Sequence, residues 1–465
     1  MRILSFLAEN HRSFREEFSL DMTRQSFKTA TPRKGQSWQD ATQPVAAIFG
    51  PNASGKSTIL DAMRYCFTCI KDSASIWLKE NKIPRAPFQL RNNAASFPSV
   101  YSLDFTLQSK CIKQKLPTDE MRFHYEFSVS ERGINHELLL GYYSSRPTRL
   151  IERDLEKGIT AWHRKMGPKI SVTNRELVLS RGFVSSHPVL APFVHNILTG
   201  IDFFEVDNNE QHLRLRLIAD DIASGRIPLS ILASLATVAD TGITNIHLDE
   251  SQATGRLNDY LRKLRKLNLE FFQPNVHQDV EEADSPIVQR ALRFQHNGAQ
   301  ESQLPIKDES SGTLGWLAMA VPIIEALKDG TVLCVDELDT SLHPSLAGEI
   351  VGLFQSRETN PLGAQLIFTS HDIGLLLPHS PAELNKEQIW FTEKDSQGVS
   401  TLFSLQDFTD IKKDSNIAKR YFEGYLGALP YLAPSHISGI VEDLREYQEN
   451  KKSRLVCEQE GLEGE

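Results

Sequence analysis

The chain has 465 residues, of which 40% are hydrophobic and 24% are charged, a composition typical of a globular protein with two or three domains. Its net charge of −9 argues against indiscriminate coating of nucleic acid, which favours a basic surface. The sequence has no apolar run near the roughly 18–20 residues that a membrane-spanning helix needs. Met1–Asn10 has too short an apolar part for a signal peptide. We therefore expect a cytoplasmic protein that does not bind membranes.

The five cysteines are an odd number and suggest no disulfide framework, which suits a reducing compartment. Cys66 and Cys69 have the spacing of half a zinc site, but no second pair or nearby histidine completes four ligands. We expect these two residues to be small apolar side chains on one face of a helix.

The most informative segment begins with an apolar run, Val45–Phe49, which predicts a buried strand. It leads directly into Gly50–Ser57, which has the G-x-x-x-x-G-K-S spelling of a phosphate-binding loop. Lys56 is expected to reach the β- and γ-phosphates of a nucleotide, and the Ser57 hydroxyl to take one position on Mg²⁺. The residues predicted to contact the nucleotide are Asn52, Ala53, Ser54, Gly55, Lys56, Ser57 and Thr58.

A second apolar strand, Thr331–Asp336, is predicted in the C-terminal half and is followed directly by Glu337. A carboxylate at such a strand end can hold Mg²⁺, which makes Asp336 a metal candidate. The adjacent Glu337 can polarise the attacking water and is the candidate catalytic base. The alternative interpretation is a buried strand that meets an acidic turn.

Two further patterns flank this strand. Glu309–Thr313 precedes a helical run, Leu314–Leu327, and the small residues Ser310, Ser311 and Gly312 suit a second phosphate-binding surface. An ordinary helix cap is the alternative. The strand Gln365–Phe368 leads to His371, which can donate to a γ-phosphate, although such a histidine can also be structural.

Together these motifs resemble the ATP-binding cassette superfamily. Gly50–Thr58 resembles its Walker A motif, Leu333–Glu337 its Walker B motif, and Asp339–Leu342 its D-loop. Glu309–Thr313 resembles a degenerate signature motif, with Ser311 and Thr313 departing from the usual spelling, and His371 resembles the switch histidine. The resemblance implies ATP and Mg²⁺ as cofactors and assigns catalysis to Glu337, His371 and Lys56.

The same resemblance implies a homodimer or higher homo-oligomer formed through ATP-bound heads, in which one subunit's signature closes on the other's nucleotide. Asp339 would act in the D-loop. Gln89 is our candidate for the glutamine that couples the metal to the partner, and an ordinary loop glutamine is the alternative.

Within the superfamily, Lys56 and Ser310 are farther apart than in transporter cassettes, and the interior shows no heptads sustained over roughly three or four repeats. The chain resembles the compact SMC-like ATPases of bacterial phage-defence loci, including OLD-family proteins and the stand-alone AbiL-, RloA- and Septu-type ATPases. Glu9–Phe14, Ile389–Lys394 and Arg420–Pro430 carry much of this likeness.

That likeness implies an ATPase sensor or scaffold that controls a separate effector, a nuclease or toxin, in anti-phage defence. The segment after Pro430 is too short for an independent nuclease domain. The alternatives are an SMC-like DNA-repair ATPase that acts directly on DNA, and a static platform that ATP stabilises.

The expected fold class is α/β: an ABC/SMC-like ATPase head with a mixed phosphate-loop sheet, an antiparallel subsheet and a mainly helical insertion. We expect residues 1–165 to form the N-terminal half, 166–285 the helical insertion or arm, 286–431 the C-terminal half and 432–465 a tail. Arg256–Leu269 can form a helix with a basic face, either solvated or in contact with nucleic acid or an acidic partner.

Overall fold

The structure is a computed structural model that describes residues 1–80, 83–108, 120–205, 208–239, 242–252, 288–296, 303–340, 342–409, 411, 415–428, 439–448 and 451. The chain divides into two compact units, Met1–Ala428 and Leu429–Glu465. In the second unit, residues 439–448 are helical. Their apolar side chains, among them Ile440 and Leu444, are exposed.

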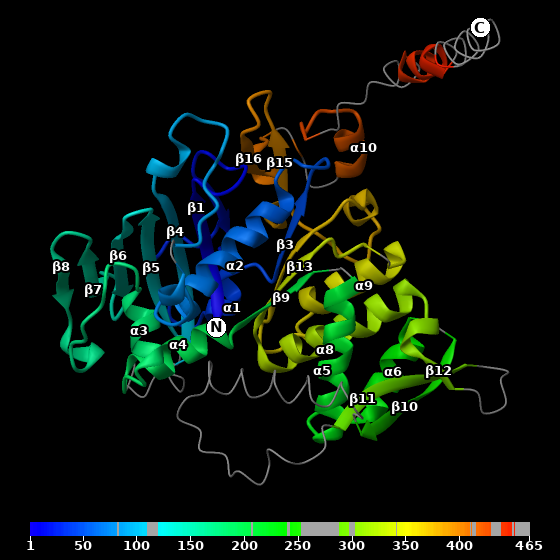
Figure 1. The fold of residues 1–465 in the computed structure, drawn as a ribbon, viewed down its shortest axis with the longest axis horizontal. Helices are drawn as coiled ribbons and strands as arrows, with labels where there is room; N and C mark the ends of the chain where they lie inside the picture. Colours follow the sequence, from blue (N-terminus) through cyan, green and yellow to red (C-terminus); the bar gives the residue numbers. More distant parts are fainter. Residues whose placement is uncertain are drawn as a thin grey trace, which may run out of the picture. The chain divides into compact units, whose positions relative to one another are not determined.

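The first unit is built on a six-stranded mixed sheet in the order β16-β15-β3-β14-β13-β9 (Figure 1). Its strands are β3 (Val45–Phe49), β9 (Ile201–Glu205), β13 (Val332–Asp336), β14 (Gln365–Thr369), β15 (Ile389–Lys394) and β16 (Ser400–Ser404). All neighbours are parallel except β15 and β16, which pair antiparallel. The central strands are buried on both faces, which explains their continuous apolar runs. The strands predicted around residues 45, 331 and 365 are confirmed.

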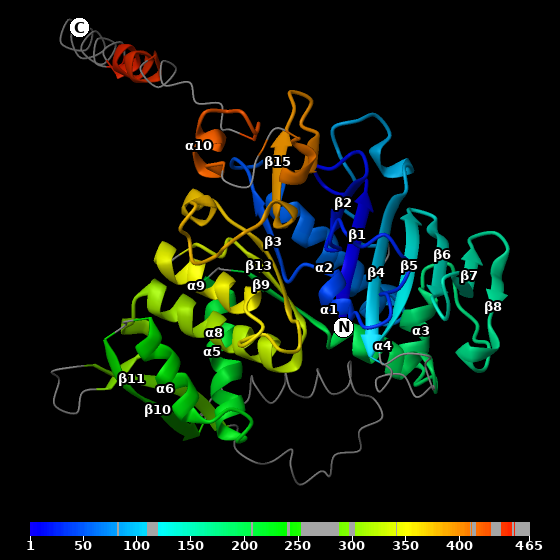
Figure 2. The ribbon, with the colours of Figure 1, turned by 180° about the vertical axis from the view of Figure 1, so that it is seen from behind.

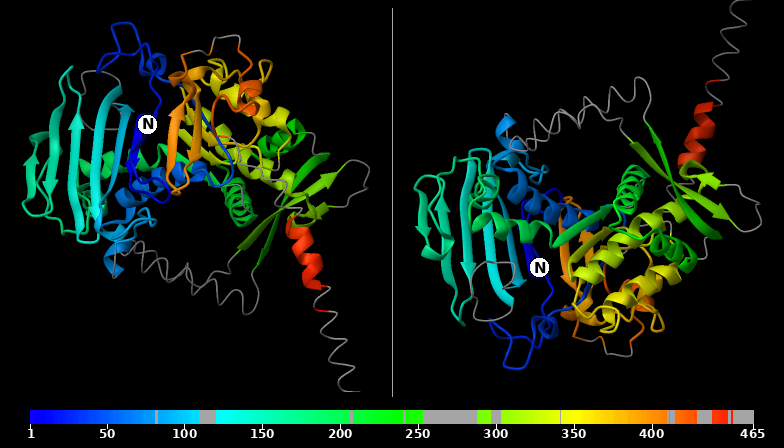
Figure 3. Two further views of the ribbon diagram at one scale, coloured as in Figure 1. Left: turned by 90° about the horizontal axis from the view of Figure 1, so that it is seen from above. Right: turned by 90° about the horizontal axis from the view of Figure 1, so that it is seen from below.

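A seven-stranded antiparallel sheet lies beside the mixed sheet, in the order β2-β1-β4-β5-β6-β7-β8 (Figure 3). Its strands are β1 (Arg2–Glu9), β2 (Phe18–Asp21), β4 (Ser99–Gln108), β5 (Glu120–Ser130), β6 (Gly133–Gly141), β7 (Thr148–Asp154) and β8 (Gly158–Trp162). Burial alternates along β5, so that one face of the sheet packs on the core.

Helix α2 (Lys56–Asp72) separates the two sheets (Figure 1). Its buried side chains share one hydrophobic core with the inner face of the antiparallel sheet and with Ala46 and Ile48 of β3. Helices α3 (Val178–Val184) and α4 (Leu190–Leu198) pack against α2. Cys66 and Cys69 lie buried on α2, as predicted. Cys111 and Cys457 lie outside the described residues.

The other face of the mixed sheet is covered by α8 (Ser311–Asp329) and α9 (Pro344–Gln355), which form a second core with Val45, Ala47 and Phe49 of β3 (Figure 2). Near α8 lie α5 (Asn208–Ala223), α6 (Leu229–Val238) and a three-stranded antiparallel sheet. That sheet contains β10 (Ile243–Gln252), β11 (Val288–His296) and β12 (Gln303–Pro305).

The remaining elements are short. They are the helices α1 (Trp38–Ala41) and α10 (Ile417–Phe422), and the 3-10 helices Ile76–Lys79, Ala94–Ser96, Arg164–Met166, Ile306–Asp308, Ile373–Leu376, Lys386–Gln388 and Leu405–Asp407. In the described part of the chain, we find no helix with both the length and the apolar character needed to cross a bilayer.

The predicted α/β fold, with a mixed phosphate-loop sheet and an antiparallel sheet, is confirmed. The domain boundaries stay predictions. Within residues 166–285, α3 to α6 are helices, whereas β9 is an edge strand of the mixed sheet and β10 belongs to the three-stranded sheet. The basic segment Arg256–Leu269 lies outside the described residues.

Candidate functional site

The loop between β3 and α2 requires glycine at two positions. Gly50 has a φ of 153°, and a Cβ there would lie 2.5 Å from both the carbonyl and the hydroxyl oxygen of Thr392 on β15. Gly55 has a φ of 115°, and its Cβ would lie 2.7 Å from the Ser400 hydroxyl on β16. The loop is therefore tightly packed against the β15–β16 hairpin, and only glycine fits both the space and the backbone conformation.

Lys56 lies folded back over this loop. Its side chain is almost fully buried, and its Nζ donates to the carbonyl oxygens of Gly50 (2.7 Å) and Pro51 (3.0 Å). Burial lowers the pKa of Lys56 to about 8, and the charges of Glu337, Asp336 and Asp339 offset only part of this effect. The ammonium group is thus held at the mouth of the loop with incomplete charge compensation.

The two carboxylates at the end of β13 are organised by a neighbouring hydroxyl. Thr369, fully buried at the end of β14, donates its Oγ1 proton to Asp336 Oδ1 at 2.6 Å and accepts from the Glu337 backbone N–H at 2.7 Å. Glu337 has a φ of 56°, the left-handed conformation that non-glycine residues seldom adopt. Thr369 therefore fixes the Asp336 side chain and the turn that presents Glu337.

His371 connects the lysine and the glutamate. Its Nδ1 lies 3.4 Å from Lys56 Nζ, and its Nε2 lies 3.7 Å from Glu337 Oε1. Its backbone N–H donates to Asp339 Oδ1 at 3.2 Å. The ends of β3, β13 and β14 thus bring together Lys56, Glu337 and His371, with Asp339 as the support of the histidine. Ser341, in the same Asp339–Leu342 segment, lies outside the described residues.

Lys56, Glu337 and His371 line a cleft of about 460 Å³. Its lining includes the predicted residues Asn52, Ala53, Gly55, Lys56, Ser57, Thr58, Glu337 and His371. Ser54 is buried behind the loop, where its hydroxyl bonds that of Thr392 at 2.6 Å. The cleft therefore gathers loop amides, a lysine, a histidine and a glutamate in one place, a combination suited to a polyphosphate.

Sequence reasoning missed three residues that also line the cleft, namely Arg12, Ser13 and Lys394. Arg12 pairs with Asp61 of α2, with Nη2 3.0 Å from Oδ1. Arg12 and Lys394 add positive charge beside Lys56, as binding of a polyphosphate requires. They lie in two segments that carried the family likeness, but no spacing rule marks them individually.

Two of the predicted metal residues, Ser57 and Asp336, have side chains that fit Mg²⁺. Ser57 and Asp336 both line a cavity of about 240 Å³ that shares Arg12, Ser57 and Thr58 with the nucleotide cleft. Both offer oxygen atoms, the ligands that Mg²⁺ prefers. The described residues contain no cluster of three or more His, Cys, Asp or Glu side chains suited to a metal.

Other predicted residues are not brought to this cleft. Ser310 is the N-cap of α8, and its Oγ accepts from the Thr313 N–H at 3.1 Å; Ser311 and Gly312 form the first turn. Gln89 is exposed, and its amide donates to the carbonyl of Pro87 at 3.0 Å. Gln89 is absent from the lining of the cleft. Nothing in the structure supports a role for Gln89 in metal binding.

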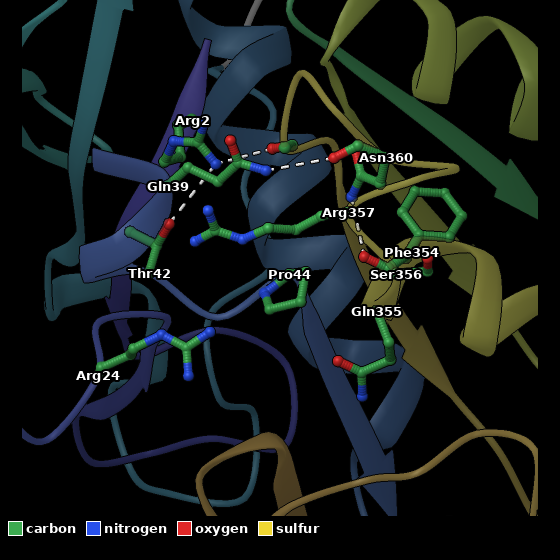
Figure 4. Close-up of a pocket in the computed structure, with 11 residues that line it drawn as sticks. Arg2, Arg24, Gln39, Thr42, Pro44, Phe354, Gln355, Ser356, Arg357 and Asn360 are labelled. Atoms are coloured by element: carbon green, nitrogen blue, oxygen red, sulfur yellow. Dashed lines mark hydrogen bonds between the residues drawn. The ribbon is translucent and has the colours of Figure 1, made fainter. Parts of the chain in front are cut away.

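A different, much smaller cavity of about 40 Å³ lies among Arg2, Arg24 and Arg357 (Figure 4). Arg2 donates to the Gly363 carbonyl at 2.7 Å and lies 3.5 Å from Glu120. Burial lowers its pKa, and Glu120 partly opposes this. The cavity is too small for a nucleotide, and Arg2 serves to tie β1 to the turn before β14.

Comparison with known proteins agrees with a nucleotide site. The family described as "AAA domain, putative AbiEii toxin, Type IV TA system" matches residues 45–377. No curated protein matches the chain in sequence.

Among solved structures, the chain is similar to an Smc head bound to the C-terminal winged-helix domain of ScpA, with 13% identity, 87% of this chain and 97% of the other covered, and a TM-score of 0.45. It is also similar to an Smc head with an extended coiled coil bound to the C-terminal domain of ScpA from Pyrococcus furiosus. For that structure the identity is 12%, the coverage 96% and 99%, and the TM-score 0.42.

The lowered pKa of Lys56 predicts proton uptake when ATP binds. At pH 8 about half of the Lys56 side chains are neutral, and contact with phosphate favours the charged form. We expect the binding enthalpy at pH 8 to differ between two buffers of unlike ionisation enthalpy. In Lys56→Arg, which stays charged, the lysine-linked part of this difference should disappear. Equal enthalpies for the wild type in both buffers would contradict the prediction.

Thr369→Val should slow ATP hydrolysis without abolishing ATP binding in the cleft. The substitution keeps the shape of the side chain but leaves the buried Glu337 N–H unpaired and removes the donor to Asp336, a cost of about 1–3 kcal/mol. We expect ATP turnover to fall about tenfold or more and to need more Mg²⁺. Thr369→Ser, which keeps the hydroxyl, is the matched control. Equal turnover in the valine and serine variants would show that the hydroxyl does not organise the site.

Proposed function

The chain belongs to the AAA-domain family whose description names the AbiEii toxin of a type IV toxin–antitoxin system, and from that premise we propose that it binds ATP·Mg²⁺ and hydrolyses the nucleotide in the cleft at Lys56. The observation that carries this proposal is the meeting of Lys56, His371 and Glu337 at the carboxyl ends of adjacent parallel strands. An ordinary acidic turn would not require this convergence of three distant segments.

Each residue has a distinct part in hydrolysis. Loop amides and Lys56 stabilise negative charge on the transferred phosphoryl group. Ser57 and Asp336 would hold Mg²⁺, which neutralises phosphate charge when bound. Glu337 orients and deprotonates the attacking water. His371, held through its backbone by Asp339, is placed to donate to the γ-phosphate.

We propose that the exposed start of α8 contacts the nucleotide bound by a second subunit. Ser310 and Ser311 are exposed, and they lie at the N-terminus of a 19-residue helix, whose dipole favours an anion. They are outside the lining of their own chain's cleft. A homodimer closed by ATP would bring this surface to the partner's γ-phosphate.

The biological role that we propose is control of a separate effector, a nuclease or toxin, during phage infection. The reference to a toxin–antitoxin system in the family description supports action together with a second component. ATP would close the dimer, and hydrolysis or a phage trigger would alter what the complex holds.

ATP turnover tests this role against its alternatives. We would measure it for the chain alone, with double-stranded DNA, and with the product of the neighbouring gene. The proposal expects the neighbour's product to bind the chain and to alter its turnover. Stimulation by DNA alone would favour a DNA-repair ATPase, and tight ATP binding without turnover in any mixture would favour a static platform.

Two single variants should separate binding from chemistry. Lys56→Ala removes a charge-assisted contact worth about 1.5–3 kcal/mol and should weaken ATP binding in calorimetry by at least tenfold. Glu337→Gln should bind ATP normally, hydrolyse it slowly and accumulate a closed dimer in size-exclusion chromatography. Normal turnover in Glu337→Gln would remove the glutamate from its catalytic role.

A mixing experiment tests assembly in trans. Ser310→Arg should retain ATP binding and lose turnover, because the arginine blocks the surface offered to the partner. In a heterodimer of Ser310→Arg with Lys56→Ala, one composite site carries both defects and the other carries neither, so turnover should partly recover. Full activity of Ser310→Arg alone would contradict the signature assignment. Failure to recover after confirmed subunit exchange would rule out independent composite sites.

A further inference from the structure

The edge strand β9 places a carboxylate directly beside Asp336. β9 runs parallel to β13, and its last residue, Glu205, is in register with Asp336, the last residue of β13. Phe203 and Cys334, two positions earlier in each strand, pack in the core that contains α2, whereas Phe204 and Val335 pack in the opposite core. Because side chains alternate along a strand, Glu205 and Asp336 both face α2.

The facing side of α2 completes a polar cavity. Ser57, Leu60, Asp61 and Arg64 have the i, i+3, i+4, i+7 spacing that places residues on one face of a helix. Together with Glu205 and Asp336 they line the cavity of about 240 Å³ that adjoins the nucleotide cleft. A single polar cavity thus extends from the metal candidates Ser57 and Asp336 to Glu205.

Glu205 already has a cationic partner, Arg64, which would compete with a metal ion for its carboxylate. The Arg64 guanidinium forms an ion pair with Glu205 and lies 5.4 Å from the centre of the Phe203 ring. The side chains of Arg64 and Glu205 are 36% and 43% exposed. Solvent therefore screens the pair, and little is lost when the carboxylate exchanges Arg64 for another cation.

We propose that Glu205 is a third protein oxygen donor of the Mg²⁺ site, directly or through a water ligand, and that Arg64 competes with the metal for it. The inference rests on the proposed ATP function. Among the residues that line the cavity, Ser57 offers a hydroxyl, and Asp336 and Glu205 offer carboxylates on the β9–β13 edge. These are ligand types that Mg²⁺ takes alongside phosphate and water. The third carboxylate of the lining, Asp61, is paired with His11 and Arg12. In this arrangement Arg64 sets how strongly Mg²⁺ contributes to ATP binding.

The same strand offers a matched control. Asp202 also pairs with an arginine, Arg214, at 2.7 Å, but it is absent from the lining of the cavity. By the alternation along β9 it faces away from α2. Asp202→Asn therefore removes the same charge from the same strand without touching the proposed metal ligand.

The experiment measures ATP affinity by calorimetry with Mg²⁺ and with EDTA, and Mn²⁺ affinity of the ATP complex by electron paramagnetic resonance. The ratio of the two ATP affinities reports coupling between metal and nucleotide. We expect Glu205→Gln to lower this ratio and the Mn²⁺ affinity by about 10- to 100-fold, the usual effect of losing a partner of a metal site. ATP affinity in EDTA should not weaken. Arg64→Met should change the ratio in the opposite direction, and Asp202→Asn should leave it as in the wild type.

An unchanged ratio in Glu205→Gln, or an equal fall in Asp202→Asn, would overturn the assignment of Glu205. If the ratio of ATP affinities with Mg²⁺ and with EDTA does not rise in Arg64→Met, the proposed competition between Arg64 and Mg²⁺ is wrong. If the wild type binds no ATP, the proposed function itself fails. If the wild type shows Mg²⁺-dependent binding that Glu205→Gln retains, only this inference fails.

Discussion

The parallel pairing of β3, β14 and β13 is the constraint on which the site depends. In this order the carboxyl ends of the three strands meet at one edge of the sheet, so Lys56, His371 and Glu337 become neighbours although they are far apart in the chain. The buried Thr369 hydroxyl then orders this edge, because it donates to the Asp336 side chain and accepts from the Glu337 backbone N–H. An apolar side chain at that position would preserve the sheet but leave a buried N–H without a partner.

Residues whose role follows from local backbone chemistry could be predicted from the sequence. The spacing of Gly50, Gly55 and Lys56 encodes a turn that only glycine permits, and the apolar runs before it and before Glu337 encode buried parallel strands. Helix α8 and its Ser310 cap could be predicted in the same way, because a hydroxyl residue just before an apolar helical run is a local signal for a helix start.

Residues whose role depends on strand order could not be predicted in this way. Thr369 acts only because β14 lies beside β13, and Glu205 faces Asp336 only because β9 joins the same edge. No periodicity in residues 201–205 predicts that β9 pairs with β13. Gln89 depends on strand order in the same way: its residue type suggests a role, but Gln89 is absent from the lining of the cleft, and its metal-coupling role stays a prediction.

The strand order also has a consequence for biosynthesis. Both neighbours of β3, the strands β14 and β15, come from the last quarter of the chain. A ribosome must therefore complete most of the polypeptide before this fully apolar strand can be paired, and such long-range pairing is slow and exposed to aggregation. During translation the phosphate loop has no sheet or hairpin to pack against, so competence to bind nucleotide arises only near the end of synthesis. A nascent or prematurely terminated chain would therefore be prone to aggregation and would lack the completed phosphate loop.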